Sequence, residues 1–277
     1  RYLTKSQNIR IWRGNAKVDK AAYNAAVDLL IKSQKDNKAD QKGNFRALQN
    51  YGMYGPYNST RNILSEQQLK SMDPQKLLNV LKNLKNYKQT VLYYGPSSIK
   101  DIDNLLAKTF KTAKKFAPLP KEKRYTLQTT PQNEVIIAPY NAKNIYMVQF
   151  HNENKEWNPN DAAKISLFNE YFGGGMNAIV FQEMREARAL AYTASASYHM
   201  PNRLGDKDYF NTFIITQNDK MMDCIAQFNE LLNNMPVRLA NFDLAKQNLL
   251  KSLASTRTTK FSILSAYMNA QKMGLNC

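Results

Sequence analysis

The chain has 277 residues, which is enough for one large domain or two smaller ones, and 43% of them are hydrophobic. This content excludes a chain that stays disordered, and no apolar run approaches the length of a membrane span. The only cysteines, Cys224 and Cys277, exclude a disulfide framework and any site built from three or four thiolates. The chain begins with Arg1 instead of a methionine, so we expect a fragment or a processed product.

Positive charge is concentrated in the first part of the chain. Lys and Arg number 39 against 22 Asp and Glu, a net charge of +17, and residues 1–120 account for +14 of it. Such a field attracts polyanions and acidic peptides without identifying them. The lysines fall on expected helices, where a solvated polar face is the default explanation, and no RNA-binding sequence pattern frames the aromatic residues. We therefore do not expect specific nucleic-acid binding.

Residues 1–117 show mainly helical patterns. Ser65 followed by Gln68 matches a capping box, and Asp73 before Pro74 supplies a second helix start. The apolar run Val91–Tyr94, bounded by Gly95, predicts a buried strand. Helices are expected over residues 18–35, from 65, from 73 and over 101–110.

A break follows at Ala117–Lys123, where two prolines stand beside a run of charge, and we take residues 118–133 as a linker. The remaining part, 134–277, contains more strand patterns. Strands are expected over 134–138, 144–151, 190–200 and 209–216, and helices over 160–188, after Asn218, over 241–256 and over 260–273. This order predicts an α+β fold, with helices packed on one face of a mainly antiparallel sheet.

Few residues have the arrangement that catalysis requires. Neither His151 nor His199 belongs to a zinc-binding spacing, so we expect each to be solvated or hydrogen-bonded and no metal or other cofactor to be bound by this chain. Cys224 falls on the apolar face of its expected helix, where a thiol is usually inert.

Three consecutive glycines, Gly173, Gly174 and Gly175, interrupt the helical pattern of residues 160–188. Because each costs roughly 1 kcal/mol in a helix relative to alanine, either the helix breaks here or another backbone passes close by. A simple kink and a loop that lets a ligand or partner approach both remain open.

The segment from Glu170 to Tyr192 resembles the insulinase/pitrilysin family of zinc metallopeptidases, and in particular a non-catalytic domain. It reads EYFGGGMNAIVFQEMREARALAY, a helix, a glycine-bearing break, a second helix and a Leu-Ala-Tyr that enters a strand. The similarity extends over about 118–277, and residues 48–96 resemble the end of a preceding repeat. The resemblance implies an α+β fold of peptidase-like repeats, with the catalytic zinc held in an N-terminal half that this chain lacks.

The resemblance also implies a role for two residues. In long members of the family, an Arg and a Tyr seven residues later reach the scissile peptide, and Arg185 and Tyr192 have that spacing. Both side chains can donate hydrogen bonds to the substrate carbonyl and to the developing oxyanion. Arg188 competes for the Arg role, whereas Glu183 and Glu186 are expected to be solvated helix charges. Peptide substrate is also expected to contact Gly173–Gly175.

Taken with the resemblance, the sequence predicts the C-terminal, non-catalytic part of a zinc metalloendopeptidase, which encloses and positions peptide substrate and is inactive alone. Residues 1–117 would end one repeat and residues 134–277 would form a second, nearly complete one. The expected partners are the peptide substrate and the N-terminal half of the same protein. The alternatives are a structural or assembly subunit of peptidase-like fold and a basic nucleic-acid-binding protein. Exported bacterial members of the family point to the periplasm or cell envelope.

Overall fold

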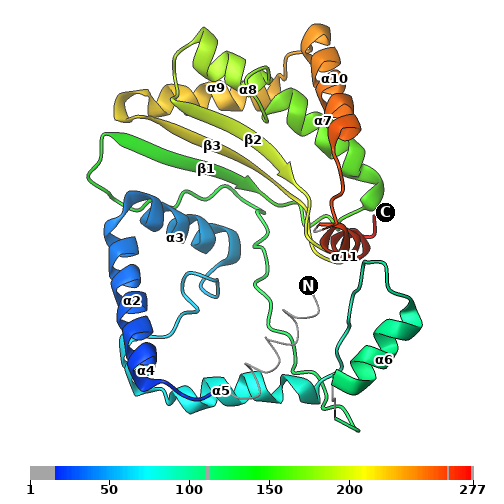
Figure 1. Cartoon of the computed structure of the whole chain (residues 1–277). Coiled ribbons are helices and arrows are strands. Elements are labelled where there is room, and N and C mark those ends of the chain that lie inside the picture. Colours follow the sequence, from blue (N-terminus) through cyan, green and yellow to red (C-terminus); the bar gives the residue numbers. More distant parts are fainter. Residues whose placement is uncertain (1–15, 110–112, 261, 276–277) are drawn as a thin grey trace. The chain divides into compact units, whose positions relative to one another are not determined.

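Antiparallel strands and helices make up the computed structural model, which describes residues 16–109, 113–260 and 262–275 (Figure 1). Arg1 and Cys277, named above, lie outside the described residues. The contacts group the chain into two units, Arg1–Asp40 with Asn62–Arg124 and Gln41–Arg61 with Tyr125–Cys277. None of the helices in the described ranges is long and apolar enough to cross a membrane.

The first unit is built from helices. Tyr23, Val27 and Ile31 of α2 pack against Leu69 of α4, and the Tyr23 hydroxyl donates a hydrogen bond to the Leu69 carbonyl at 2.7 Å. Its elements are α2 (Lys20–Ala39), α4 (Glu66–Ser71), α5 (Pro74–Asn83), η1 (Leu84–Asn86) and α6 (Ile99–Thr109).

Two helix starts in this unit confirm the predicted caps. The Ser65 hydroxyl accepts a hydrogen bond from the Gln68 amide, and the Gln68 side chain accepts one from the Ser65 amide. Asp73 accepts a hydrogen bond from the Gln75 amide, and Pro74 begins α5. Both signals identify helix starts because they satisfy amides that have no partner within the helix.

Two predicted strands are wrong. Residues 91–94 and 134–138 are irregular, although both runs are rich in β-branched or aromatic residues. Val91 is 50% exposed and Val135 84% exposed, so neither run is buried. A strand needs a hydrogen-bonded neighbour, and within the described residues the sheet pairing includes neither segment.

The second unit contains a three-stranded antiparallel sheet in the order β1-β3-β2. Asn144 of β1 (Asn144–His151) lies opposite Gln217 of β3 (Tyr209–Gln217), and Thr193 of β2 (Thr193–His199) lies opposite Ile215. Residues of β3 alternate between buried and half-buried, so its side chains point to the two faces in turn.

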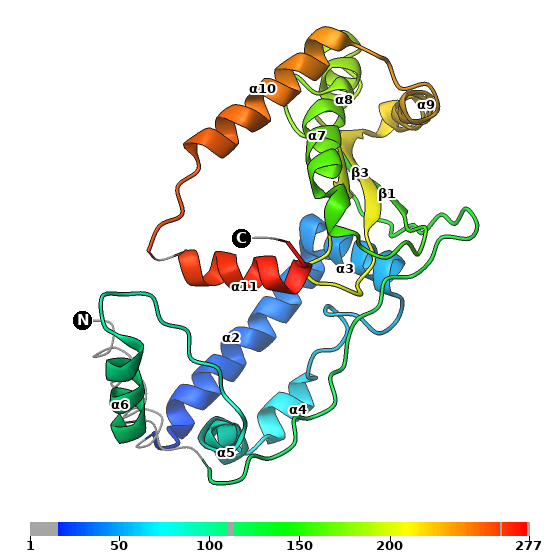
Figure 2. The same ribbon diagram turned by 90° about the vertical axis from the view of Figure 1, so that its right-hand side faces the viewer.

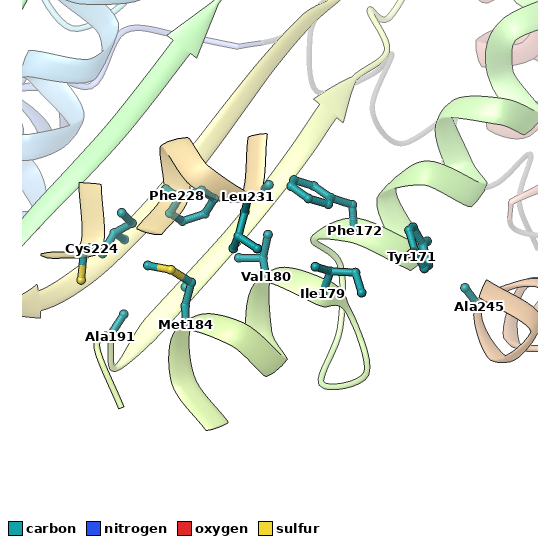
Figure 3. Packing of buried hydrophobic residues seen from close by; sticks show 13 residues of the cluster. Tyr171, Phe172, Ile179, Val180, Met184, Ala191, Cys224, Phe228, Leu231 and Ala245 are labelled. Carbon is teal, nitrogen blue, oxygen red and sulfur yellow. The ribbon is translucent and has the colours of Figure 1, made fainter. Parts of the chain in front are cut away.

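Most helices of this unit lie on one face of the sheet, as predicted, and α3 (Gln41–Tyr54), described below, is the exception (Figure 2). They are α7 (Ala162–Phe172), α8 (Ile179–Phe181), the π-helix η3 (Gln182–Ala187) and α9 (Met221–Asn233), and α10 (Leu239–Ser255) packs on α7. The core lies between these helices and the sheet, and Figure 3 shows Phe172, Val180, Met184 and Phe228 converging there. Short 3-10 turns at η2 (Pro159–Asp161) and η4 (Asn218–Lys220) precede α7 and α9, and α11 (Ile263–Met273) follows α10. The α+β class is confirmed.

One further helix, α3 (Gln41–Tyr54), contacts β1 of the same unit. The Phe45 ring meets the Tyr146 ring edge-on at 5.6 Å, and the Gln41 amide donates to the Asn144 carbonyl at 2.7 Å. Phe45 also contacts Phe213, whose neighbour Ile214 is fully buried in the core, so α3 covers the opposite face of the sheet. The repeat boundaries at 117 and 134 stay a prediction.

Candidate functional site

The segment between α7 and β2 forms a corner that carries the two residues singled out in the sequence. The chain leaves α7 at Gly173, turns, and continues through α8 into η3 as far as Ala187. Ala189 then adopts a left-handed backbone with φ 48°, a conformation that few residues other than glycine adopt. This turn ends the π-helix and directs the chain toward β2.

Arg185 and Tyr192 lie side by side at this corner. The guanidinium carbon of Arg185 is 5.9 Å from the centre of the Tyr192 ring and 5.0 Å from the centre of the Phe181 ring, both within the range of a cation–π contact. Tyr192 is 77% exposed, and the Arg185 side chain is 48% exposed. The pair can therefore donate hydrogen bonds to a molecule that approaches from solvent, and its catalytic role stays a prediction.

Hydrogen bonds from neighbouring elements fix the backbone of the corner. The Leu190 carbonyl accepts from the Thr216 hydroxyl at 2.5 Å and from the Cys224 thiol at 3.3 Å. The Tyr192 amide donates to the Ile215 carbonyl at 2.9 Å. Strand β3 and helix α9 thus hold the residues that precede β2, which limits how far the Tyr192 ring can move.

Glu183 differs from the expectation of a solvated charge, because it is buried and only 8% exposed. Its two carboxylate oxygens accept hydrogen bonds from Arg188, which follows η3, and from Arg238, the residue before the first turn of α10. Burial by itself would raise the pKa of this carboxyl, but the hydrogen bonds from Arg238 and Arg188 outweigh it and the pKa lies below its ordinary value. The Arg188 guanidinium is therefore bound to Glu183 in this structure, whereas Arg185 is not.

The glycines of the break have different surroundings. A Cβ on Gly173 would lie 2.0 Å from the Ala196 carbonyl oxygen of β2, so only glycine fits where α7 passes the strand. A Cβ on Gly174 would lie 2.8 Å from the Asn169 carbonyl oxygen, whereas one on Gly175 would meet nothing within 4 Å. Close backbone approach accounts for the first glycine, and substrate contact at all three stays a prediction.

The two histidines lie at the ends of strands and have hydrogen-bonding partners. His151 Nδ1 is 3.2 Å from the Thr130 hydroxyl, and His199 Nε2 is 2.7 Å from Asn211 Oδ1. His199 also stacks on the Tyr209 ring at 4.6 Å. Within residues 16–109, 113–260 and 262–275, no group of three or more His, Cys, Asp or Glu side chains could hold a metal ion.

Cys224 is fully buried in the core, as its helical position predicted. Burial raises the pKa of the thiol, although a hydrogen bond from Thr216 acts in the opposite direction. A neutral, buried thiol that donates to the Leu190 carbonyl is a packing residue and not a nucleophile.

Two features could not be identified from sequence spacing. The first is the pairing of Glu183 with Arg188. Side chains five residues apart do not lie next to each other on an α-helix, but they do so on a π-helix, and this segment is one.

The second feature is a pocket of about 200 Å³, which we call the α10 pocket. It is lined by the end of α7, the loop before α8 and one side of α10, with Glu170, Gly175, Met176, Asn177, Ala178, Asn241, Ala245 and Asn248.

Comparison with known proteins identifies the family to which the chain belongs. The family described as the peptidase M16 inactive domain matches residues 72–249, more than half of the chain. No curated protein sequence matches the chain significantly.

Several solved structures of proteases have a similar fold. A mutant of the ferredoxin protease FusC, in complex with Arabidopsis ferredoxin, is similar with a TM-score of 0.66 and 12% identity over 91% of this chain and 28% of that one. The periplasmic protease PqqL from Escherichia coli has a TM-score of 0.64 and 14% identity, over 92% and 28%. A protease from Helicobacter pylori has a TM-score of 0.62 and 12% identity, over 93% and 64%. The chain thus spans less than two thirds of each of these proteins.

Proposed function

Because the chain belongs to the family of M16 peptidase inactive domains, we propose that it is the non-catalytic part of a zinc metalloendopeptidase and that it encloses and positions peptide substrate. The similar protease chains are longer than this one, which supports a further part of the protein that would hold the metal. Zinc would supply the Lewis acid for peptide hydrolysis there. The two histidines and the other described residues of this chain do not fit a zinc site, so no step is assigned to the metal here.

The exposed Arg185–Tyr192 pair is the observation that supports this proposal most directly. The Tyr192 hydroxyl can donate a hydrogen bond, and the Arg185 guanidinium has donors only, so both suit a peptide carbonyl whose oxygen gains negative charge. The contact between the two side chains orders the guanidinium before substrate arrives. Ordering of this kind lowers the entropy lost when a substrate binds.

The test uses the full-length protein and single-turnover cleavage of a fluorogenic peptide. Tyr192→Phe and Arg185→Ala are compared with Tyr94→Phe and Arg257→Ala, which alter exposed residues that do not belong to the corner segment. We expect cleavage to slow only in the first two variants. Equal rates in all four would contradict the proposal, and a full-length protein without any zinc-binding spacing would favour the structural-subunit alternative.

A further inference from the structure

The Arg185 guanidinium contacts two aromatic rings, one from each side of the corner. Phe181 lies four residues before Arg185, and its ring centre is 5.0 Å from the guanidinium carbon. Tyr192 belongs to the segment that leads into β2, and its ring centre is 5.9 Å from the same carbon. The guanidinium is therefore nearer to Phe181, which has no side-chain donor, than to the tyrosine with which it would act on a substrate.

Polar contacts do not fix the position of the Arg185 side chain. In the part of the chain that the structure describes, no group accepts a hydrogen bond from its guanidinium. The Glu186 carboxylate is 3.8 Å from Arg185 Nε, and because both side chains are about half exposed this ion pair stabilises little. Arg188 differs, since the buried Glu183 carboxylate accepts its hydrogen bond. The aromatic contacts are thus the main constraint on the Arg185 guanidinium.

Phe181 is the better anchored of the two rings. It is the last residue of α8, whose other residues, Ile179 and Val180, are fully buried and belong to the core (Figure 3). The π-helix η3 begins directly after it. Phe181 itself is half-buried, whereas Tyr192 is 77% exposed. The Phe181 ring therefore gives the guanidinium a fixed surface before any substrate binds.

We propose that Phe181 is a positioning residue, which holds the Arg185 guanidinium beside Tyr192 so that both can donate to one substrate carbonyl. A guanidinium over the face of a ring keeps its N–H groups available at its edge, so the contact orders Arg185 without using its donors. Without the ring, the same side chain can turn toward Glu186, and a donor is lost to the substrate. This role of Phe181 rests on the function proposed above for Arg185 and Tyr192.

The first measurement does not depend on cleavage. Heteronuclear NMR of the chain follows the Nε–Hε signal of Arg185, which is assigned by its loss in Arg185→Ala. Because a nearby ring shifts this proton, Phe181→Leu should move the signal toward that of a freely exposed arginine, and Phe181→Tyr should not. Phe150→Leu is the matched control, since Phe150 is also half-buried but contacts the Tyr209 ring. A signal that stays in place in Phe181→Leu, or that moves equally in Phe150→Leu, would overturn the proposal.

The second measurement is kcat/KM of the full-length protein for a fluorogenic peptide. Loss of an exposed cation–π contact corresponds to about a two- to fivefold change, so Phe181→Leu should lower kcat/KM by that factor. Phe181→Tyr, which keeps a ring, should rescue most of the loss. In the Arg185→Ala background Phe181→Leu should have no further effect, because no guanidinium is left to position. An equal loss in both backgrounds would mean that Phe181 acts only through packing, and it would overturn the proposal.

Arg185→Ala separates failure of this role from failure of the proposed function. If Arg185→Ala itself leaves cleavage unchanged, the function proposed for the pair is wrong, and the positioning role is wrong with it. If Arg185→Ala slows cleavage but Phe181→Leu does not, the pair keeps its function and Phe181 has no positioning role.

Discussion

At the scale of single residues, Glu183 links the corner to the rest of the second unit. Its carboxylate lies between Arg188, which directly follows the π-helix, and Arg238 at the start of α10, two residues that the sequence does not place together. A buried carboxylate stays ionised only where such donors compensate for the lost hydration. Arg185 lies two residues after Glu183 in the same π-helix, so its position depends on these hydrogen bonds.

Arg188→Ala is therefore expected to lower the free energy of unfolding, although the residue is partly exposed. Glu183 would keep Arg238 but lose half of its hydrogen bonding, and because Arg188 is 43% exposed the cost should be about 1–2 kcal/mol in the free energy of unfolding. Urea denaturation monitored by circular dichroism measures it. In the Glu183→Gln background the same substitution should cost less, because no buried charge is left unpaired. An unchanged unfolding midpoint for Arg188→Ala would contradict this role.

Tyr192→Phe tests the predicted donor. The ring and its contact with Arg185 are retained, so the fold should survive, while one hydrogen-bond donor to the developing oxyanion is lost. Removal of such a donor typically lowers kcat by about 10²–10³. The measurement is kcat of the full-length enzyme with a zinc site intact. Unchanged kcat would leave the corner with a purely structural role.

Asp208 predicts a pH dependence of stability. It is only 2% exposed, Tyr198 donates a hydrogen bond to it, and its Oδ2 atom is buried without a partner in the part of the chain that the structure describes. Burial raises the pKa of the Asp208 carboxyl, and burial together with Asp208 raises the pKa of Tyr198 to about 12. Because the folded state favours the protonated carboxyl, its contribution to stability is present at low pH and is lost as pH rises through the raised pKa.

Asp208→Asn should therefore stabilise the protein at neutral pH by about 1 kcal/mol, since the amide resembles the protonated acid and can still accept from Tyr198. The gain should disappear below the unfolded-state pKa of aspartate, near pH 4. Urea unfolding of both proteins across this range gives the difference. A gain that is the same at every pH would show that ionisation of Asp208 is not its cause.

At the scale of elements, the glycine break shows what sequence can and cannot predict. Three glycines in a helical pattern predicted a break or a close backbone contact, and Gly173 makes both. The contacting strand, β2, could not be named beforehand because it begins 20 residues later and meets α7 only in the folded unit. The runs at 91–94 and 134–138 illustrate the converse, since strand-forming residues remain irregular when no strand pairs with them.

Gly173→Ala should disrupt the packing of α7 on β2. Its Cβ would overlap the Ala196 backbone, which cannot move as a flexible side chain can, so we expect a loss of at least about 2 kcal/mol in unfolding free energy. Gly175→Ala is the matched control, because its Cβ meets nothing within 4 Å, and it should change stability by less than about 0.5 kcal/mol. Thermal unfolding compares the two. Equal midpoints would show that α7 and β2 can separate without cost.

At the scale of the whole molecule, the order of the elements and the composition predicted the α+β class, and the helix-to-strand segment predicted the family. Those features depend on periodicity and local caps, which a sequence displays directly. The Glu183 cluster and the α10 pocket depend on which side chains the fold brings together. Asn241 and Asn248 carry no local signal that would separate them from ordinary polar positions of a helix.

The net charge of +17 gives a prediction for the entire chain. We expect it to bind acidic peptides more tightly than neutral ones of equal length, and to lose most of that preference as salt rises, because charges are screened beyond a Debye length of about 8 Å at physiological ionic strength. Fluorescence anisotropy of labelled peptides at several salt concentrations measures this effect.

A scrambled acidic peptide of the same composition is the control, and it should bind equally well because a diffuse field does not recognise sequence. Single-stranded and duplex nucleic acids provide the comparison. Counterion release predicts that their binding also weakens steeply between low and physiological salt. A nucleic-acid complex that is sequence-specific and persists in high salt would instead require base contacts, and it would favour a nucleic-acid-binding protein over a peptide-positioning domain.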